Sequence, residues 1–172
     1  MLENTTPQNI ELNIDSNVTF MVKADRTGTI EYTNLDYAKL SEYGIAELIG
    51  KDISALIHPD MPSAIFNHIW ESLFKKERAY AIFKNISKTG KYFWLQVNID
   101  FKVNEETREI ENIYAYYSKT SESAKKELNT LFKKVKSIET HTNIDIAENY
   151  LNGYLDEQDL DYKSLIEKHY IN

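Results

Sequence analysis

Four polar side chains stand where a bound small molecule could use them: Asn34, His58, Asp60 and Asn85. Amides and carboxylates exchange hydrogen bonds with the polar edge of a ligand, and an imidazole also changes charge near neutral pH. Each residue has a simpler structural interpretation as well. Asn34 and Asp60 precede helical patterns and could cap a turn or helix, and His58 could be a structural loop histidine.

Asn85 lies in the stretch 79–87, whose residues alternate as those of a strand do. The alternation places Asn85 on the same face as Ala81 and Phe83. If that face lines the interior, the amide needs partners, because a buried unpaired polar group costs roughly 1–3 kcal/mol. The partner could be a ligand, a neighbouring backbone group or a water molecule.

Trp70 belongs to a segment in which apolar residues recur at helical spacing, namely Ile65, Phe66, Ile69, Trp70, Leu73 and Phe74. It could stack on a flat cofactor or simply fill the core. His58 is also a conceivable haem ligand. The other histidines, His68, His141 and His169, lack the spacing of a metal site.

The elements that position these residues follow a clear order along the chain. Strands are predicted over 18–22, 29–33, 79–87, 92–103 and 110–118, and helices over 35–40, 45–49 and 62–74. An irregular stretch, 53–61, precedes the third helix. This order predicts an α+β domain with one five-stranded antiparallel sheet and helices on one side.

The strand over 92–103 should present Trp94, Gln96 and Asn98 on the face away from the interior. An exposed strand face that carries tryptophan is typical of a docking surface for a partner. Cover by the chain's own C-terminal helices is the alternative.

Residues 121–172 form a helical extension, and residues 1–16 a cap or flexible lead. An apolar stripe in the extension, Leu128, Leu131, Phe132, Val135 and Ile138, must be buried on the sheet or in a dimer seam. A second helix is expected to start near Thr142 and to end at Gly153. Asp161 should cap a third.

Composition excludes several classes of function. The chain of 172 residues has no cysteine, so disulfides, thiolate catalysis and covalent flavin–thiol chemistry are excluded. The absence of disulfides fits a protein of the reducing cytoplasm. A net charge of −7 argues against nucleic acid as the main partner. No signal peptide or membrane-spanning stretch is evident, and no catalytic motif is present, so we expect a cytoplasmic protein that is not an enzyme.

Several short motifs together resemble the PAS domains of aerotaxis receptors and of stand-alone PAS proteins that partner energy-taxis receptors. The motifs are Ile30-Glu31-Tyr32-Thr33-Asn34, His58-Pro59-Asp60-Met61-Pro62, Phe66 with Ile69-Trp70, Phe83-Lys84-Asn85, and Lys88-Thr89-Gly90-Lys91-Tyr92-Phe93-Trp94. The resemblance covers about residues 17–120. It implies a PAS sensor that binds FAD without a covalent link, reports redox or energy state to a chemotaxis-type membrane receptor or its signalling domain, and can form a homodimer.

The resemblance also implies roles for individual residues. Asn34, His58, Trp70 and Asn85 match positions linked to flavin binding, and Asp60 matches the loop beside them. Ile57 departs from the pattern, because the family usually has an arginine there that could pair with phosphate. The alternatives are a PAS adaptor with another small ligand or none, and a haem sensor.

Overall fold

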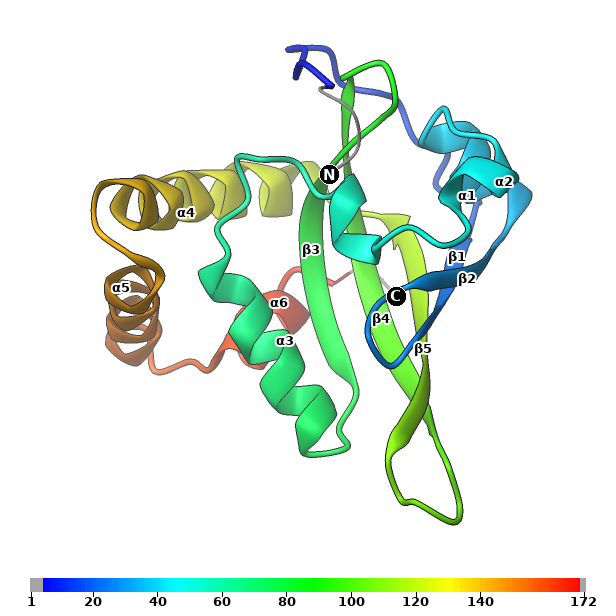
Figure 1. Cartoon of the computed structure of the whole chain (residues 1–172). Helices are drawn as coiled ribbons and strands as arrows, with labels where there is room; N and C mark the ends of the chain where they lie inside the picture. The colour runs from blue at the N-terminus through cyan, green and yellow to red at the C-terminus, as the bar shows by residue number, and fades with distance from the viewer. Residues whose placement is uncertain (1–4, 171–172) are drawn as a thin grey trace.

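The computed structural model describes residues 5–170, and Figure 1 shows its single sheet between helices on two sides. The strands are β1 Phe20–Asp25, β2 Ile30–Thr33, β3 Ala79–Ile86, β4 Tyr92–Val103 and β5 Ile110–Lys119. The helices are α1 Leu35–Leu40, α2 Ile45–Leu48, α3 Ala64–Phe74, α4 Glu122–His141, α5 Ile144–Glu157 and α6 Tyr162–Glu167, with a 3-10 turn η1 at Ile53–Leu56.

All strand pairs are antiparallel, in the order β2-β1-β5-β4-β3. The predicted α+β fold with a five-stranded antiparallel sheet is therefore confirmed. The first strand lies a few residues later than predicted, because the side chain of Asp25 accepts the backbone N–H groups of Thr27 and Thr29 and so fixes the turn after it. Gly28 completes that turn with a φ of +92°, where a side chain would be strained.

Strand β4 carries the alternation that the sequence predicts. Phe93, Leu95 and Val97 are fully buried on the inner face, which α3 covers. Asn85 of β3 pairs in register with Phe93, so its side chain shares that inner face, as expected. Phe66 of α3 stacks on Phe83 with ring centroids 5.6 Å apart, which fixes the helix against the sheet.

The N-terminal segment is packed rather than loose from residue 5 onward; residues 1–4 of the predicted lead lie outside the described residues. The backbone N–H of Leu12 donates to the carbonyl of Tyr92, and Tyr92 donates back to Ile10. A Cβ at Gly90 would clash with the carbonyl oxygen of Thr6, so this close approach requires glycine. These contacts favour the cap over the flexible lead.

The C-terminal helices wrap around the β3 edge, and α4 and α6 lie on the side of the sheet away from α3 (Figure 1). The α4 stripe is buried within the chain at Leu128, Leu131, Phe132 and Val135, and α4 packs against α5, so these side chains are covered without a dimer seam. Tyr80, which faces outward on β3, makes an edge-to-face contact with Tyr170 just after α6.

Helix α5 corrects two details of the prediction. Its N-cap is Asn143, whose side chain accepts the N–H of Ile146, and not Thr142. The helix also continues through Gly153 to Glu157. A helical glycine costs about 1 kcal/mol, but continuing the helix buries Leu155, which offsets that cost.

The outer sheet face is covered rather than exposed, which is the alternative that the sequence left open. Trp94 and Gln96 point outward as the alternation requires, yet only 4% and 1% of their surfaces are exposed. Asn98, the third residue of this face, is half-buried. The physical reason is the extension itself, since α4 and α6 cover this side of the sheet.

We expect Phe132→Ala to lower the free energy of unfolding by about 3–5 kcal/mol, because the side chain is 1% exposed and its loss leaves a cavity. The matched control is Tyr150→Ala on the exposed side of α5, which should cost less than about 1 kcal/mol. Urea unfolding followed by tryptophan fluorescence measures both. Equal small effects would mean that α4 is not part of the core.

Candidate functional site

A cavity of about 230 Å³ lies between the inner sheet face, helix α3, the turn after β1 and η1. Its wall consists of Ala24, Thr27, Gly28, Asp52, Ile53, Ser54, Ile57, Phe66, Ile69, Trp70, Leu73, Phe83, Ile99, Ile113, Ala115 and Tyr117. Most of these side chains are aliphatic or aromatic. Such a wall suits the flat apolar part of a small molecule.

Aromatic pairs stiffen the wall. Trp70, half-buried on α3, packs against Phe74 with ring centroids 6.1 Å apart. Tyr117 of β5 stacks on Tyr37 of α1 at 5.2 Å. Burial raises the pKa of both tyrosines far above neutrality, so their hydroxyls stay protonated. Trp70 is the one predicted flavin contact that the structure brings into the cavity wall.

Asn85 has an unused hydrogen-bond acceptor in the interior. Its side-chain NH₂ donates to the carbonyl of Phe83 at 3.2 Å, but the Oδ1 atom is buried and has no partner among the described residues. Asn85 itself is 1% exposed. It lies outside the cavity wall, two residues along β3 from Phe83, which belongs to that wall.

Both polar atoms of the Asn34 side-chain amide make hydrogen bonds within the fold. Its Oδ1 accepts the N–H groups of Met21 and Tyr37, each at 3.1 Å, and its Nδ2 donates to the carbonyl of Thr19 at 2.9 Å. These contacts cap α1 and tie it to the start of β1. The predicted cap is therefore present, and Asn34 is not part of the cavity wall.

His58 and Asp60 lie along the β3 edge and contact residues of the outer sheet face. The backbone N–H of His58 donates to the carbonyl of Lys84, and Asp60 pairs with the Lys84 ammonium at 2.7 Å. The His58 ring meets the outward-facing Tyr92 edge-on at 6.3 Å. Neither residue lines the cavity, because the loop turns their side chains toward the opposite side of the sheet.

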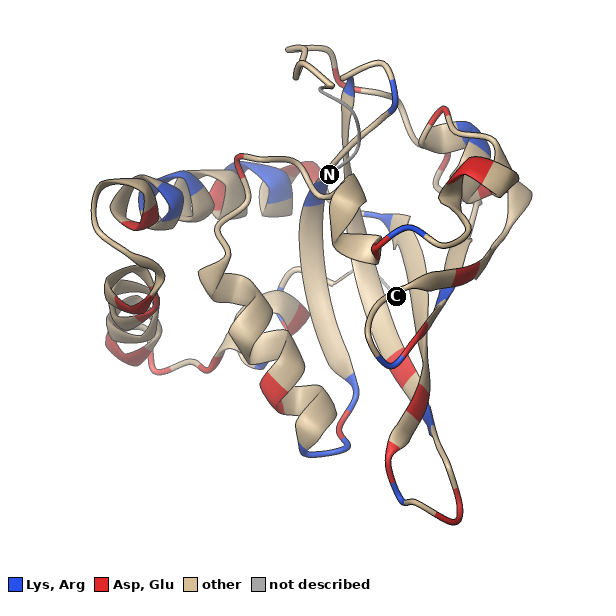
Figure 2. Cartoon of the chain, in the orientation of Figure 1, with Lys and Arg blue, Asp and Glu red and all other residues tan. Residues whose placement is uncertain are grey.

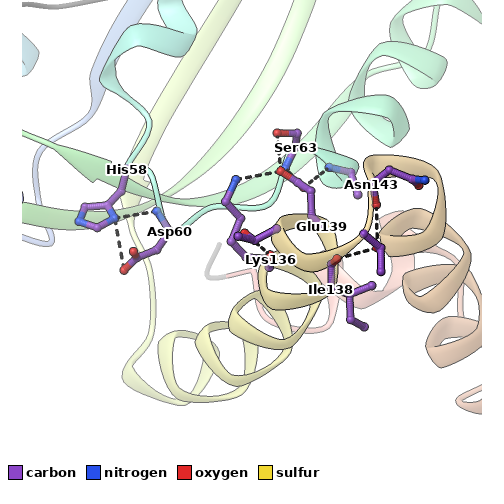
Figure 3. Close-up of polar contacts among 10 residues, drawn as sticks. His58, Asp60, Ser63, Lys136, Ile138, Glu139 and Asn143 are labelled. Carbon is purple, nitrogen blue, oxygen red and sulfur yellow. Dashed lines mark hydrogen bonds and ion pairs between the residues drawn. The ribbon is translucent and has the colours of Figure 1, made fainter.

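The buried His58 imidazole is neutral at physiological pH. Burial, and then the nearby Lys84 charge, lower its pKa to about 4, against a smaller opposing effect of Asp60. Its Nδ1 accepts the backbone N–H of Asp60 at 3.1 Å (Figure 3). This bond holds the turn that leads into α3.

Helix α4 reaches the start of α3 through Glu139. Its carboxylate accepts the Ser63 N–H at 2.6 Å, the Ser63 hydroxyl at 2.9 Å and the Ala64 N–H at 3.4 Å. Lys136 pairs with the same carboxylate at 2.8 Å, as Figure 3 shows. Burial alone would raise the pKa of Glu139, but these hydrogen bonds lower it. A residue of the extension thus supplies the N-terminal cap of the helix that bounds the cavity.

Two residues that line the cavity, Tyr117 and Ile57, were not predicted from the sequence as ligand contacts. Tyr117 follows Ile113 and Ala115 at alternate positions of β5, so strand alternation could have placed it on the inner face. Ile57 lines the cavity directly, where the family's arginine would introduce a charge.

No cluster of three or more His, Asp or Glu side chains in residues 5–170 could hold a metal ion. Within the same range, every helix is too short or too polar to cross a bilayer.

Comparison with a protein-family model described as PAS fold gives a match over residues 30–115. The aerotaxis receptor of Escherichia coli K12 is 36% identical over 93 residues, which is 54% of this chain and 18% of that receptor. The chain therefore spans less than a fifth of the receptor's length.

Solved structures share the fold at low identity. A light-oxygen-voltage domain studied with a flavin analogue superimposes with a TM-score of 0.57 and 22% identity, over 65% of this chain and 84% of that one. The light-state LOV domain of the blue-light photoreceptor Aureochrome1 gives 0.57 and 20%, over 64% of this chain and 88% of that one.

Protonation of His58 should destabilise the fold as the pH falls. A pKa of about 4 in the folded chain lies below the ordinary value of 6.5, so the unfolded chain binds the extra proton first and stability is lost below about pH 6.5. We expect a loss of roughly 1–2 kcal/mol between pH 7 and pH 5, measured by urea unfolding.

His58→Asn keeps an acceptor for the Asp60 N–H but cannot titrate, so it should remove most of this slope. Burial also lowers the pKa of His68, so His68 should still contribute to the loss of stability in the same pH range. The control, Asn152→Gln at an exposed position of α5 that does not titrate, should leave the slope unchanged. An unaltered slope in His58→Asn would contradict the assignment.

Glu139→Gln should cost about 1–2 kcal/mol, because the charged cap of α3 is lost. Amide hydrogen exchange should quicken at Ser63 and Ala64 in particular. Glu105→Gln, an exposed position in the turn after β4, is the control. Matching exchange rates at Ser63 in both variants would show that the cap does not hold α3.

Proposed function

The chain belongs to the PAS fold family, and on this premise we propose that it is a sensor whose inner cavity holds FAD non-covalently. The observation that carries the proposal is the cavity of about 230 Å³ with apolar and aromatic walls between α3 and the sheet. The likeness to an aerotaxis receptor and to LOV domains supports a flavin over other flat ligands.

The residues on this side of the sheet fit the flat ring of a flavin. Phe66, Ile69 and Trp70 present apolar surface from α3, opposite Phe83 and Ile99. Asn85 lies outside the wall, two residues beyond Phe83, so its unpartnered Oδ1 would accept a hydrogen bond from an N–H where the polar ring edge extends past Phe83 along β3. A buried acceptor of this kind favours a ligand that can donate to it.

A bound flavin would supply a redox reaction that changes the charge and the N–H groups of its ring. Asn85 would respond by gaining or losing a hydrogen bond, and β3 would carry the change. The opposite face of the sheet holds Trp94 and Gln96 beneath the extension, so a change in β3 would first alter the packing of α4 and α6. Such a response needs two packings of similar free energy.

The receiver of the signal, on this proposal, is a chemotaxis-type membrane receptor or its signalling domain. The relative named an aerotaxis receptor supports this choice. The PAS domain and the extension would act in the cytoplasm, and the sensor itself would perform no catalysis. A homodimer is compatible with this arrangement.

A second candidate is an adaptor that holds a smaller apolar ligand or none. Ile57 favours it, since the side chain adds apolar surface to the wall where a guanidinium would bind phosphate. A haem sensor has less support, because His58 is outside the wall and its Nδ1 already accepts the Asp60 N–H.

The test is the visible absorption spectrum of the purified chain, before and after incubation with FAD. We expect a flavin spectrum, and about tenfold or more weaker binding in Trp70→Ala and Asn85→Ala. Trp94→Phe, on the far side of the sheet, is the matched control and should bind normally. Colourless protein that takes up no FAD would leave the adaptor as the better function.

A further inference from the structure

A second hollow adjoins the cavity at the far end of α3. This groove, of about 340 Å³, shares Trp70, Leu73 and Ile113 with the cavity wall. The three shared side chains form the border between the two spaces. The groove opens onto the surface beside Phe74, which is 78% exposed.

Three cations from three separate turns line the groove. Arg26 comes from the turn after β1, Lys76 from the turn after α3, and Arg108 from the turn after β4. Figure 2 shows basic residues in all three turns, toward the lower end of the sheet. In a chain with a net charge of −7, this convergence of positive charge is a local exception.

Two of these cations have no acidic partner among residues 5–170. Arg26 pairs with Glu109 at 2.6 Å, and Glu109 is the one acid in the groove wall. The exposed Lys76 and Arg108 form no ion pair in the described part of the chain. Both also hold left-handed backbones, with φ of 58° and 62°, where glycine would be free of strain.

The cavity alone is small for a ligand site. At about 230 Å³ the cavity is smaller than the ~300–1,000 Å³ typical of ligand sites, whereas cavity and groove together fall within that range. A flat ring would fill the first space, and the rest of a larger ligand would need the second. Ile57 lines only the cavity, so it does not affect the groove.

We propose that the groove is an anion subsite, in which Lys76 and Arg108 bind the phosphate end of a ligand whose flat ring occupies the cavity. This inference rests on the proposed function and adds to it the place of the phosphate end, beside Lys76 and Arg108 and outside the apolar cavity. Arginine and lysine are the side chains that recognise phosphate by charge and hydrogen bonding. Phe74 extends the apolar floor beneath the chain that joins ring and phosphate.

The experiment titrates riboflavin, FMN and FAD into the full chain and compares dissociation constants. FMN and FAD should bind about tenfold more tightly than riboflavin, and added salt should reduce this advantage. In the double variant Lys76→Gln/Arg108→Gln the advantage should disappear while riboflavin binds as before. Unchanged riboflavin binding shows that the variant is folded and its cavity intact.

The matched control, Lys126→Gln/Lys134→Gln on exposed positions of α4, removes the same charge elsewhere and should keep the advantage. Equal affinities for riboflavin and FMN in the unaltered chain would overturn the subsite and leave the flavin cavity standing. So would an advantage that survives the groove variant, or one that the control also loses. Failure of all three flavins to bind would overturn the proposed function and the subsite together.

Discussion

The position of α3 above the sheet is the constraint on which the site depends. The helix must approach closely enough for Phe66 to stack on Phe83, yet leave a cavity beside Trp70. The stacked pair fixes the first turn of the helix against the strand. Glu139 then fixes its N-terminus from the far side of the molecule, through three hydrogen bonds at Ser63 and Ala64. Because protein interiors are close-packed, a cavity persists only where such contacts prevent collapse.

The extension and the PAS domain therefore form one packed unit. Helices α4 and α6 bury the outward face of β4. Burial raises the pKa of the Asp60 carboxyl, but the hydrogen bond from Lys84 lowers it, and Lys133 of α4 adds a smaller lowering effect. The side chains of His58 and Asp60 lie along the β3 edge, against Tyr92 and Lys84. His58 and Asp60 connect the loop before α3 to the edge of β3 and to the extension.

Local patterns predicted the elements because each depends on near neighbours in sequence. Period-two alternation placed Asn85 inside, and the cap residues Asn34 and Asp161 act where they were expected. What covers a face cannot be read from alternation, since the burial of Trp94 depends on the packing of helices that begin only at Glu122. The directions of His58 and Asp60 depend in the same way on the path of a loop along β3. The cavity is still harder to predict from the sequence, because it is a volume that side chains from six strands and helices and the turns between them fail to fill.

The same contacts would couple α3 and α4 in both directions. If a ligand shifts α3, the shift changes the fit of Ser63 against Glu139 and so the position of α4. Linkage then requires the converse: a partner that displaces α4 must alter the affinity of the cavity for its ligand by the same free energy. The size of this coupling is bounded by the contacts that differ between the two positions, here a few charge-assisted hydrogen bonds of about 1.5–3 kcal/mol each at most. Gain or loss of one such bond would shift populations by about tenfold to a hundredfold, and could do so without any rearrangement of the sheet.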